Sequence, residues 1–113
     1  MLFRSVNRGE IWSVAGGVYA SKPRPAVILQ DDLFDGTGSV TVCPLTSTNV
    51  AAPLLRMPLP ADGITGLDAI SFVMVDKITT VRRTSVSQRI GRLSSTQLVE
   101  LERLVMVFLG LAA

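Results

Sequence analysis

Histidine is absent from the 113-residue sequence, and Cys43 is its only cysteine. The lack of histidine removes the commonest general acid or base and the commonest metal ligand. A single cysteine excludes an intramolecular disulfide and a thiolate metal site, so Cys43, in the apolar run 40–43, is predicted to be a small core residue. We therefore expect neither a metal ion nor another cofactor.

Long apolar runs are also missing. The longest, residues 104–109, is far too short to span a bilayer. Residues 1–5 contain no extended apolar region and no small-residue cleavage site, so no secretory signal is apparent. These features predict a protein of the reducing cytoplasm with no membrane contact.

Charge is sparse as well. Charged residues make up 18% of the chain and apolar residues 48%, with a net charge of +2. The length predicts one domain over residues 1–113. Because so much apolar surface is hard to hide in a small monomer, the composition favours an oligomer. The slight positive charge permits an anionic partner without requiring one.

Apolar patterning predicts five to seven short strands followed by one helix. Residues 8–14 are expected to form a turn followed by a strand, and further strands are expected over 26–30, 39–45, 54–59, 71–76 with 78–81, and 84–92. The segment 71–81 is either one long strand or two halves of a bent one. Three prolines around 54–59 favour an edge position, because proline cannot donate to a ladder. The fold class is mainly β (β-rich α+β), a small barrel or curled antiparallel sheet with a C-terminal helix.

The helix has clear start and stop signals. Ser94 and Gln97 fit a capping box, and Gly110 fits a C-terminal stop. An apolar stripe, formed by Leu98, Leu101, Leu104, Val105, Phe108 and Leu109, indicates burial against the sheet or against a second subunit.

The segment 22–30 carries the most suggestive charge. Pro23 and Pro25 hold Arg24 extended at the start of a buried strand. A fixed guanidinium there suits phosphate binding. Alternatively, Arg24 is a surface residue paired with one of the carboxylates at positions 31, 32 and 76.

Taken in order, the motifs of this sequence resemble those of the MazF/PemK/Kid family of bacterial toxin endoribonucleases. The matching pieces are Arg8-Gly9-Glu10-Ile11-Trp12, Pro23-Arg24-Pro25-Ala26-Val27-Ile28, Pro44-Leu45-Thr46-Ser47, Gly66-Leu67 before the strand carrying Asp76, and the closing Leu109-Gly110-Leu111. The resemblance implies an SH3-like barrel, a homodimer, and metal-independent cleavage of single-stranded RNA at short sequences. It also implies a cognate antitoxin whose disordered tail covers the RNA groove.

The resemblance also implies three catalytic residues. Arg24 matches the cationic residue that follows the proline, Thr46 the hydroxyl at the strand end, and Asp76 an acidic residue that some members use as a base. Two features depart from the family: the loop before Arg24 lacks the glutamate or histidine of several members, and Met74 replaces an arginine found in some.

RNA cleavage without a metal uses the 2′-hydroxyl as nucleophile. We hypothesise that Asp76 accepts its proton, Arg24 stabilises the phosphorane charge, and Thr46 holds a phosphate oxygen. Lys22 is a candidate donor to the leaving 5′-oxygen, although an ordinary lysine pKa near 10.4 suits that role poorly.

Six further residues are predicted to contact RNA. Tyr19 is a candidate for base stacking, and the polar or basic side chains are Lys22, Ser47, Lys77, Arg82 and Arg83. Structural alternatives stand beside these roles: an Asp76–Lys77 surface ion pair, a turn capped by the Thr46 hydroxyl, and simple solvation of the basic residues. Trp12 is expected in the core.

Two other function classes remain open. A gyrase poison of the CcdB type shares the superfamily fold, but the C-terminus here lacks the tryptophan of those toxins. The third class is a non-catalytic SH3-like adaptor with the apolar helix end as its docking surface.

Overall fold

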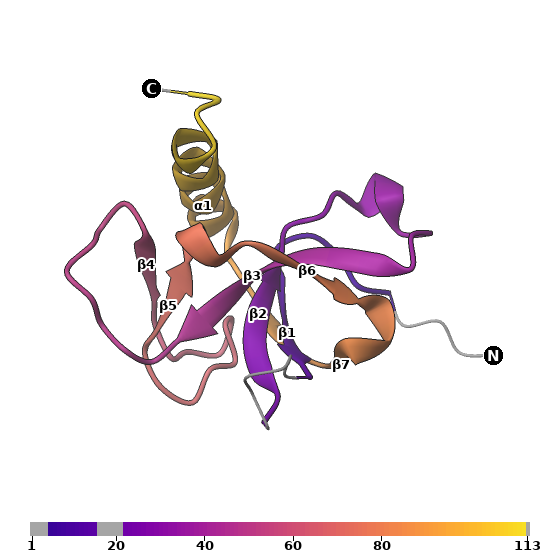
Figure 1. The fold of residues 1–113 in the computed structure, drawn as a ribbon. Coiled ribbons are helices and arrows are strands. Elements are labelled where there is room, and N and C mark those ends of the chain that lie inside the picture. The colour runs from indigo at the N-terminus through magenta and orange to yellow at the C-terminus, as the bar shows by residue number, and fades with distance from the viewer. Residues whose placement is uncertain (1–4, 16–21, 113) are drawn as a thin grey trace.

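The computed structural model describes residues 5–15 and 22–112, which form a seven-stranded antiparallel sheet and one α-helix (Figure 1). The strands are β1 (Glu10–Val14), β2 (Arg24–Ile28), β3 (Ser39–Thr46), β4 (Arg56–Leu59), β5 (Ser71–Met74), β6 (Thr79–Arg82) and β7 (Val86–Arg92). The helix is α1 (Ser95–Phe108), and three 3-10 turns are η1 (Asp32–Phe34), η2 (Val75–Lys77) and η3 (Arg83–Ser85). No helix in the described part of the chain is long and apolar enough to cross a membrane.

Strand β3 organises the sheet. It pairs with β2 along one edge, while β6 and β5 share its other edge, with η2 between them (Figure 1). The predicted segment 71–81 is therefore two halves of an interrupted strand. Strands β4 and β7 end the hydrogen-bonded path, so the sheet curls without closing over the described residues. This confirms the fold class and the edge position expected from the prolines near β4.

The two faces of the sheet bury different cores. One core lies under α1 and contains Ile11, Val27, Leu45, Val73 and Leu101 among others. The other lies on the opposite face and includes Trp12, Val14, Ala26 and Val42. Successive side chains of a strand alternate between the two faces of the sheet. The face of any strand residue can therefore be inferred from the core to which the next residue along the strand belongs.

The helix begins as predicted. The Ser94 hydroxyl accepts from the Gln97 backbone N–H at 3.2 Å, and the Gln97 side chain accepts from the Ser94 N–H at 2.8 Å. Leu101 and Leu104 are buried, but Phe108 is 45% and Leu109 54% exposed. The expected burial against the sheet is therefore wrong for the last turn, because the helix runs past the sheet (Figure 1).

Strand β2 begins and ends two residues earlier than expected. Arg24 pairs with Val14 of β1, which draws the residues around Pro25 into the ladder. At the other end, the N–H groups of Leu29 and Gln30 both donate to the Thr41 carbonyl, and this irregular pairing ends the strand. Arg24 is thus a strand residue rather than the residue before a strand.

Candidate functional site

The pairing of β2 with β3 brings Arg24 and Thr46 to the same end of these two strands. The β2–β3 register pairs Ala26 with Pro44 and Val27 with Cys43. Continued by two residues toward the strand ends, this register sets Arg24 level with Thr46. Both side chains then point to the face opposite α1, because Ala26, two residues from Arg24, belongs to the core on that face.

The Thr46 hydroxyl already makes one hydrogen bond. Its oxygen accepts from the Thr48 backbone N–H at 3.1 Å, so the turn-capping role considered as an alternative is present. A hydroxyl has two lone pairs and one hydrogen, and accepting this bond leaves the hydrogen available to donate. Turn capping and phosphate binding are therefore compatible, and the turn fixes the position of the oxygen.

Arg24 is exposed and forms no ion pair within residues 5–15 and 22–112. The alternative pairing with nearby carboxylates is therefore wrong for the described structure. Asp31 and Asp32 accept backbone N–H groups instead, from Leu33 at 2.9 Å and Arg8 at 2.7 Å. An uncompensated guanidinium at the end of a strand is suited to receive an anion.

Asp76 forms an ion pair with Arg56, which was not among the site residues predicted from the sequence. Nη1 of Arg56 donates to Asp76 Oδ1, whereas Lys77 Nζ lies 3.9 Å from Oδ2. The Arg56 hydrogen bond, together with the charge of that guanidinium, holds the pKa of Asp76 below its ordinary value of 3.8. Asp76 is therefore anionic at neutral pH, and the expected Lys77 pair is its weaker contact.

Arg56 reaches Asp76 from the neighbouring edge strand. The β4–β5 register places Arg56 directly opposite Met74, the position at which some family members carry an arginine. Residues directly opposite in an antiparallel pair project from the same face. No local spacing signals this contact, because 20 residues separate Arg56 from Asp76; only the pairing of the predicted strands 54–59 and 71–76 could have found it.

Asp76 is tied to the Thr46 face of β5 through Arg56, which lies opposite Met74 on that face. Thr46 pairs with Phe72, and Phe72 and Met74 lie on one face of β5. Since Val42 pairs with Thr79 and Leu45 with Val73, η2 runs beside the middle of β3. Asp76 is then about three residues along β3 from Thr46, or roughly 10 Å. The structure thus groups Arg24 with Thr46 and sets Asp76 nearby.

The other predicted RNA contacts divide into two sets. Lys22 and Ser47 are exposed and flank Arg24 and Thr46 in the chain. Arg82 pairs with Ser39, at the opposite end of β3, seven residues or roughly 23 Å from Thr46. Arg83 follows there, and its Nε donates to the Thr37 carbonyl at 2.7 Å, so this residue anchors a loop. Tyr19 lies outside the described residues.

Two residues expected in the core are there. Trp12 is buried, with Nε1 donating to Glu10 Oε1 at 3.0 Å. Cys43 is fully buried, and its thiol donates to the Met74 carbonyl at 3.2 Å. Burial, and then the negative charge of Asp76, raise the pKa of Cys43 to about 12. The described residues contain no cluster of three or more histidine, cysteine, aspartate or glutamate side chains that could hold a metal.

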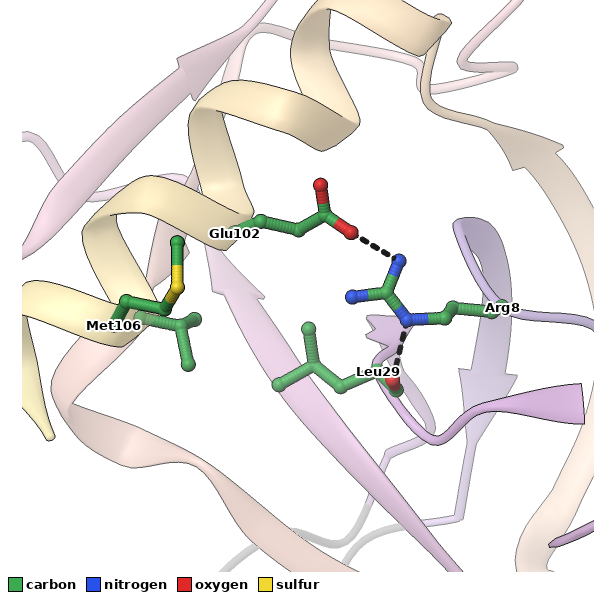
Figure 2. A pocket seen from close by; sticks show the side chains of 5 residues that line it. Arg8, Leu29, Glu102 and Met106 are labelled. Atoms are coloured by element: carbon green, nitrogen blue, oxygen red, sulfur yellow. Dashed lines mark hydrogen bonds and ion pairs between the residues drawn. The ribbon is translucent and has the colours of Figure 1, made fainter. Parts of the chain in front are cut away.

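A separate pocket of about 410 Å³ lies between α1 and the end of β2 (Figure 2). It is lined by Arg8, Leu29, Glu102, Val105 and Met106. Arg8 spans it, with Nη1 2.7 Å from Glu102 Oε2 and Nε 3.0 Å from the Leu29 carbonyl (Figure 2). Because its charges are paired with each other, this pocket does not extend the site at Arg24.

Known proteins resemble the chain over nearly its whole length. Residues 7–109 match the family described as PemK-like, MazF-like toxin of type II toxin–antitoxin system. The probable endoribonuclease MazF of Mycolicibacterium smegmatis is 48% identical, covering 95% of this chain and 99% of that protein. Endoribonuclease MazF9 of Mycobacterium tuberculosis is 31% identical, covering 94% and 98%.

Solved structures agree with the sequence relatives. The Mycobacterium tuberculosis toxin MazF-mt6 superposes with a TM-score of 0.77 at 25% identity, over 92% of this chain and 99% of that one. A mycobacterial endoribonuclease in complex with its cognate antitoxin has a TM-score of 0.78, over 95% and 97%; at 20% identity this match supports the fold alone. The chain therefore belongs to the PemK-like, MazF-like family of toxins of type II toxin–antitoxin systems.

Proposed function

We propose that the chain is a toxin endoribonuclease that cuts single-stranded RNA at short sequences without a metal ion. The observation that carries this proposal is the exposed Arg24, which has no ion pair among the described residues and lies at the same end of the β2–β3 pair as Thr46 in a toxin-family fold. Its sequence relatives in Mycolicibacterium smegmatis and Mycobacterium tuberculosis are named as endoribonucleases.

In the proposed reaction, the ribose 2′-oxygen attacks the adjacent phosphorus and the bond to the 5′-oxygen breaks. The products are a 2′,3′-cyclic phosphate and a 5′-hydroxyl end. Arg24 would stabilise the charge that develops on the phosphorane oxygens, and Thr46 would donate its hydroxyl hydrogen to one of them. Donors fixed in advance toward developing charge are often the largest single catalytic contribution.

Asp76 is the candidate base for the 2′-hydroxyl. It is ionised at neutral pH, which a base requires, although its lowered pKa limits the driving force for proton transfer. Lys22, exposed beside β2, is the candidate donor to the leaving 5′-oxygen. Ser47 and Lys77, both exposed, would contact neighbouring parts of the RNA.

The proposed partners are a second copy of the chain and a cognate antitoxin. The exposed apolar residues at the end of α1, Phe108, Leu109 and Leu111, leave unpartnered surface of the kind that subunit contacts cover. One structural neighbour was solved in complex with its cognate antitoxin. The proposed location is the cytoplasm, where RNA and antitoxin would both be present.

The test is to incubate the purified protein with a mixed RNA pool in EDTA and to map the ends by sequencing. We expect discrete cuts at a short sequence, with 2′,3′-cyclic or 3′-phosphate ends. The matched control is Arg24→Ala purified in parallel, which should leave the RNA uncut if the activity belongs to this chain. Intact RNA with trapped gyrase–DNA complexes would instead indicate a gyrase poison, and intact RNA without that effect an adaptor.

A further inference from the structure

We propose that Arg56 is a positioning residue of this site, which fixes the orientation of the Asp76 carboxylate at the turn η2. This inference rests on the proposed function and assigns a role to a residue on the edge strand. Arg56 would not touch the RNA; it would act through Asp76.

Hydrogen bonds to one backbone carbonyl connect Arg56 with the turn that carries Asp76. The Leu55 carbonyl accepts from Arg56 Nη1 at 2.8 Å and from the Val75 N–H at 3.0 Å. The same Nη1 also donates to Asp76 Oδ1. The Leu55 carbonyl, immediately before β4, thus ties the guanidinium to the turn that carries Asp76, so the two groups are fixed relative to each other.

The burial of Arg56 is costly and its hydrogen bonding incomplete. The side chain is only 13% exposed, and its Nε is buried with no hydrogen-bond partner among the described residues. A buried donor left without a hydrogen bond destabilises the folded protein. In its observed orientation, Arg56 donates a hydrogen bond to Asp76 while its own Nε has no acceptor among the described residues. This is expected if the position of the arginine is set by its contact with the carboxylate.

Among the described residues, no other neighbour can hold the Asp76 carboxylate in this way. Lys77 is 60% exposed and 3.9 Å from the carboxylate, too far for a hydrogen bond. The Cys43 thiol on β3 stays neutral. Helix α1 packs against η2, but its charged residues are engaged elsewhere: Glu100 with Arg103, and Glu102 with Arg8. Arg82, on the adjoining β6, pairs with Ser39 at the far end of β3.

The experiment measures kcat/KM on a cleavable RNA oligonucleotide from pH 4 to 8 for wild type, Arg56→Gln, Arg56→Lys and Asp76→Asn. Loss of the guanidinium should raise the pKa of Asp76 and so move the low-pH side of the Arg56→Gln profile to higher pH. Arg56→Lys keeps the positive charge but loses the planar guanidinium with its several donors. The low-pH side of its profile should therefore move less than that of Arg56→Gln, while its kcat/KM falls below that of the wild type. Arg103→Gln, which removes another ion-paired arginine, should leave the profile unchanged.

A second readout uses no RNA. The carboxyl of Asp76, followed by NMR in the wild type and in Arg56→Lys and Arg56→Gln, should titrate at higher pH in the variants. Unchanged titration and an unchanged low-pH side of the profile in a folded variant would overturn the inference. If Asp76→Asn cuts at the wild-type rate, both the proposed base and the role of Arg56 are wrong. If the wild type cuts no RNA, the proposed function fails by itself, and an unchanged titration would still exclude Arg56 as the residue that holds Asp76.

Discussion

Val14 of β1 pairs with Arg24 of β2, so ladder hydrogen bonding supports the backbone beneath the exposed guanidinium. Val14 itself is buried in the core on that face of the sheet. The chain thus sets a charge with no ion-pair partner among residues 5–15 and 22–112 directly beside packed apolar side chains. This arrangement fixes the Cα position of Arg24, so only the rotamer of its side chain can adjust to a substrate.

Replacing Arg24 should separate activity from stability. Arg24→Ala is expected to lower kcat by roughly 10²–10³, the cost of losing one preorganised oxyanion donor. Because the side chain is exposed, the free energy of unfolding should change by no more than about 0.5 kcal/mol. Cleavage assays and urea denaturation measure the two quantities. Arg24→Lys should fall between wild type and alanine, and an alanine variant of full activity would contradict the assignment.

Thr46 allows a pair of variants that differ by little more than a hydroxyl. Thr46→Val should cut RNA about 10–100 times more slowly, since a hydrogen bond to a charged group contributes roughly 1.5–3 kcal/mol. Thr46→Ser keeps the hydroxyl that accepts from Thr48 and should retain most activity. Single-turnover cleavage rates test both. Equal rates for valine and serine would show that the hydroxyl only caps the turn.

Gly91 is predicted to be intolerant of any side chain. A Cβ at this position would lie 2.2 Å from the Thr65 carbonyl oxygen, on a loop whose Ile64 carbonyl accepts from the Arg92 N–H. Gly91→Ala should therefore destabilise the protein by about 1–3 kcal/mol or prevent folding. Thermal denaturation provides the measurement. Gly36→Ala is the control, because nothing lies within 4 Å of its Cβ, and its melting temperature should hardly change.

Glu10 should make the free energy of unfolding depend on pH in the acidic range. Burial alone would raise its pKa, but hydrogen bonds from Asn7, Trp12 and Arg89 outweigh burial and lower the pKa from 4.5. A carboxylate with a lowered folded-state pKa stabilises the fold above its unfolded pKa, and this contribution is lost as the pH falls through the folded value. Glu10→Gln should cost about 1–2 kcal/mol at pH 7.

Urea denaturation at pH 7 and pH 3 checks this dependence. The difference between wild type and Glu10→Gln should be smaller at pH 3 than at pH 7, because the stabilisation from the lowered pKa of Glu10 decreases as the pH falls below the unfolded-state pKa. Arg103→Gln, which disrupts a more exposed ion pair, is the comparison variant and should have little effect at either pH. An equal deficit at both pH values would mean that the glutamate acts through packing alone.

Much of the fold follows from local patterns. The strands, the edge position of β4 and the Ser94 cap were all predictable, because alternation, proline and capping chemistry act over a few residues. The exposure of Phe108 was not, since helical spacing shows which residues share a face but not where the sheet beneath that face ends.

The site was predictable only in part. The flanking prolines mark Arg24 as a charge fixed at a strand end, whereas Thr46 was identified through the resemblance to the toxin family. Pairing of the consecutive strands β2 and β3 then brings both residues to the same end of the sheet. Arg56 has no such signal: it lies in an apolar strand 20 residues from Asp76, and the contact depends on the register across a long connection. Such a register is set by tertiary packing.

Cys43, the sole thiol of the chain, is fully buried in the core. Its raised pKa keeps the thiol protonated well above physiological pH. Alkylating reagents react with the thiolate, so the native protein should resist them at pH 8. A cysteine introduced at exposed Ser47 would then be the one rapidly labelled position, and a fluorophore or spin label there could report RNA arriving beside Thr46 without any prior removal of native thiols.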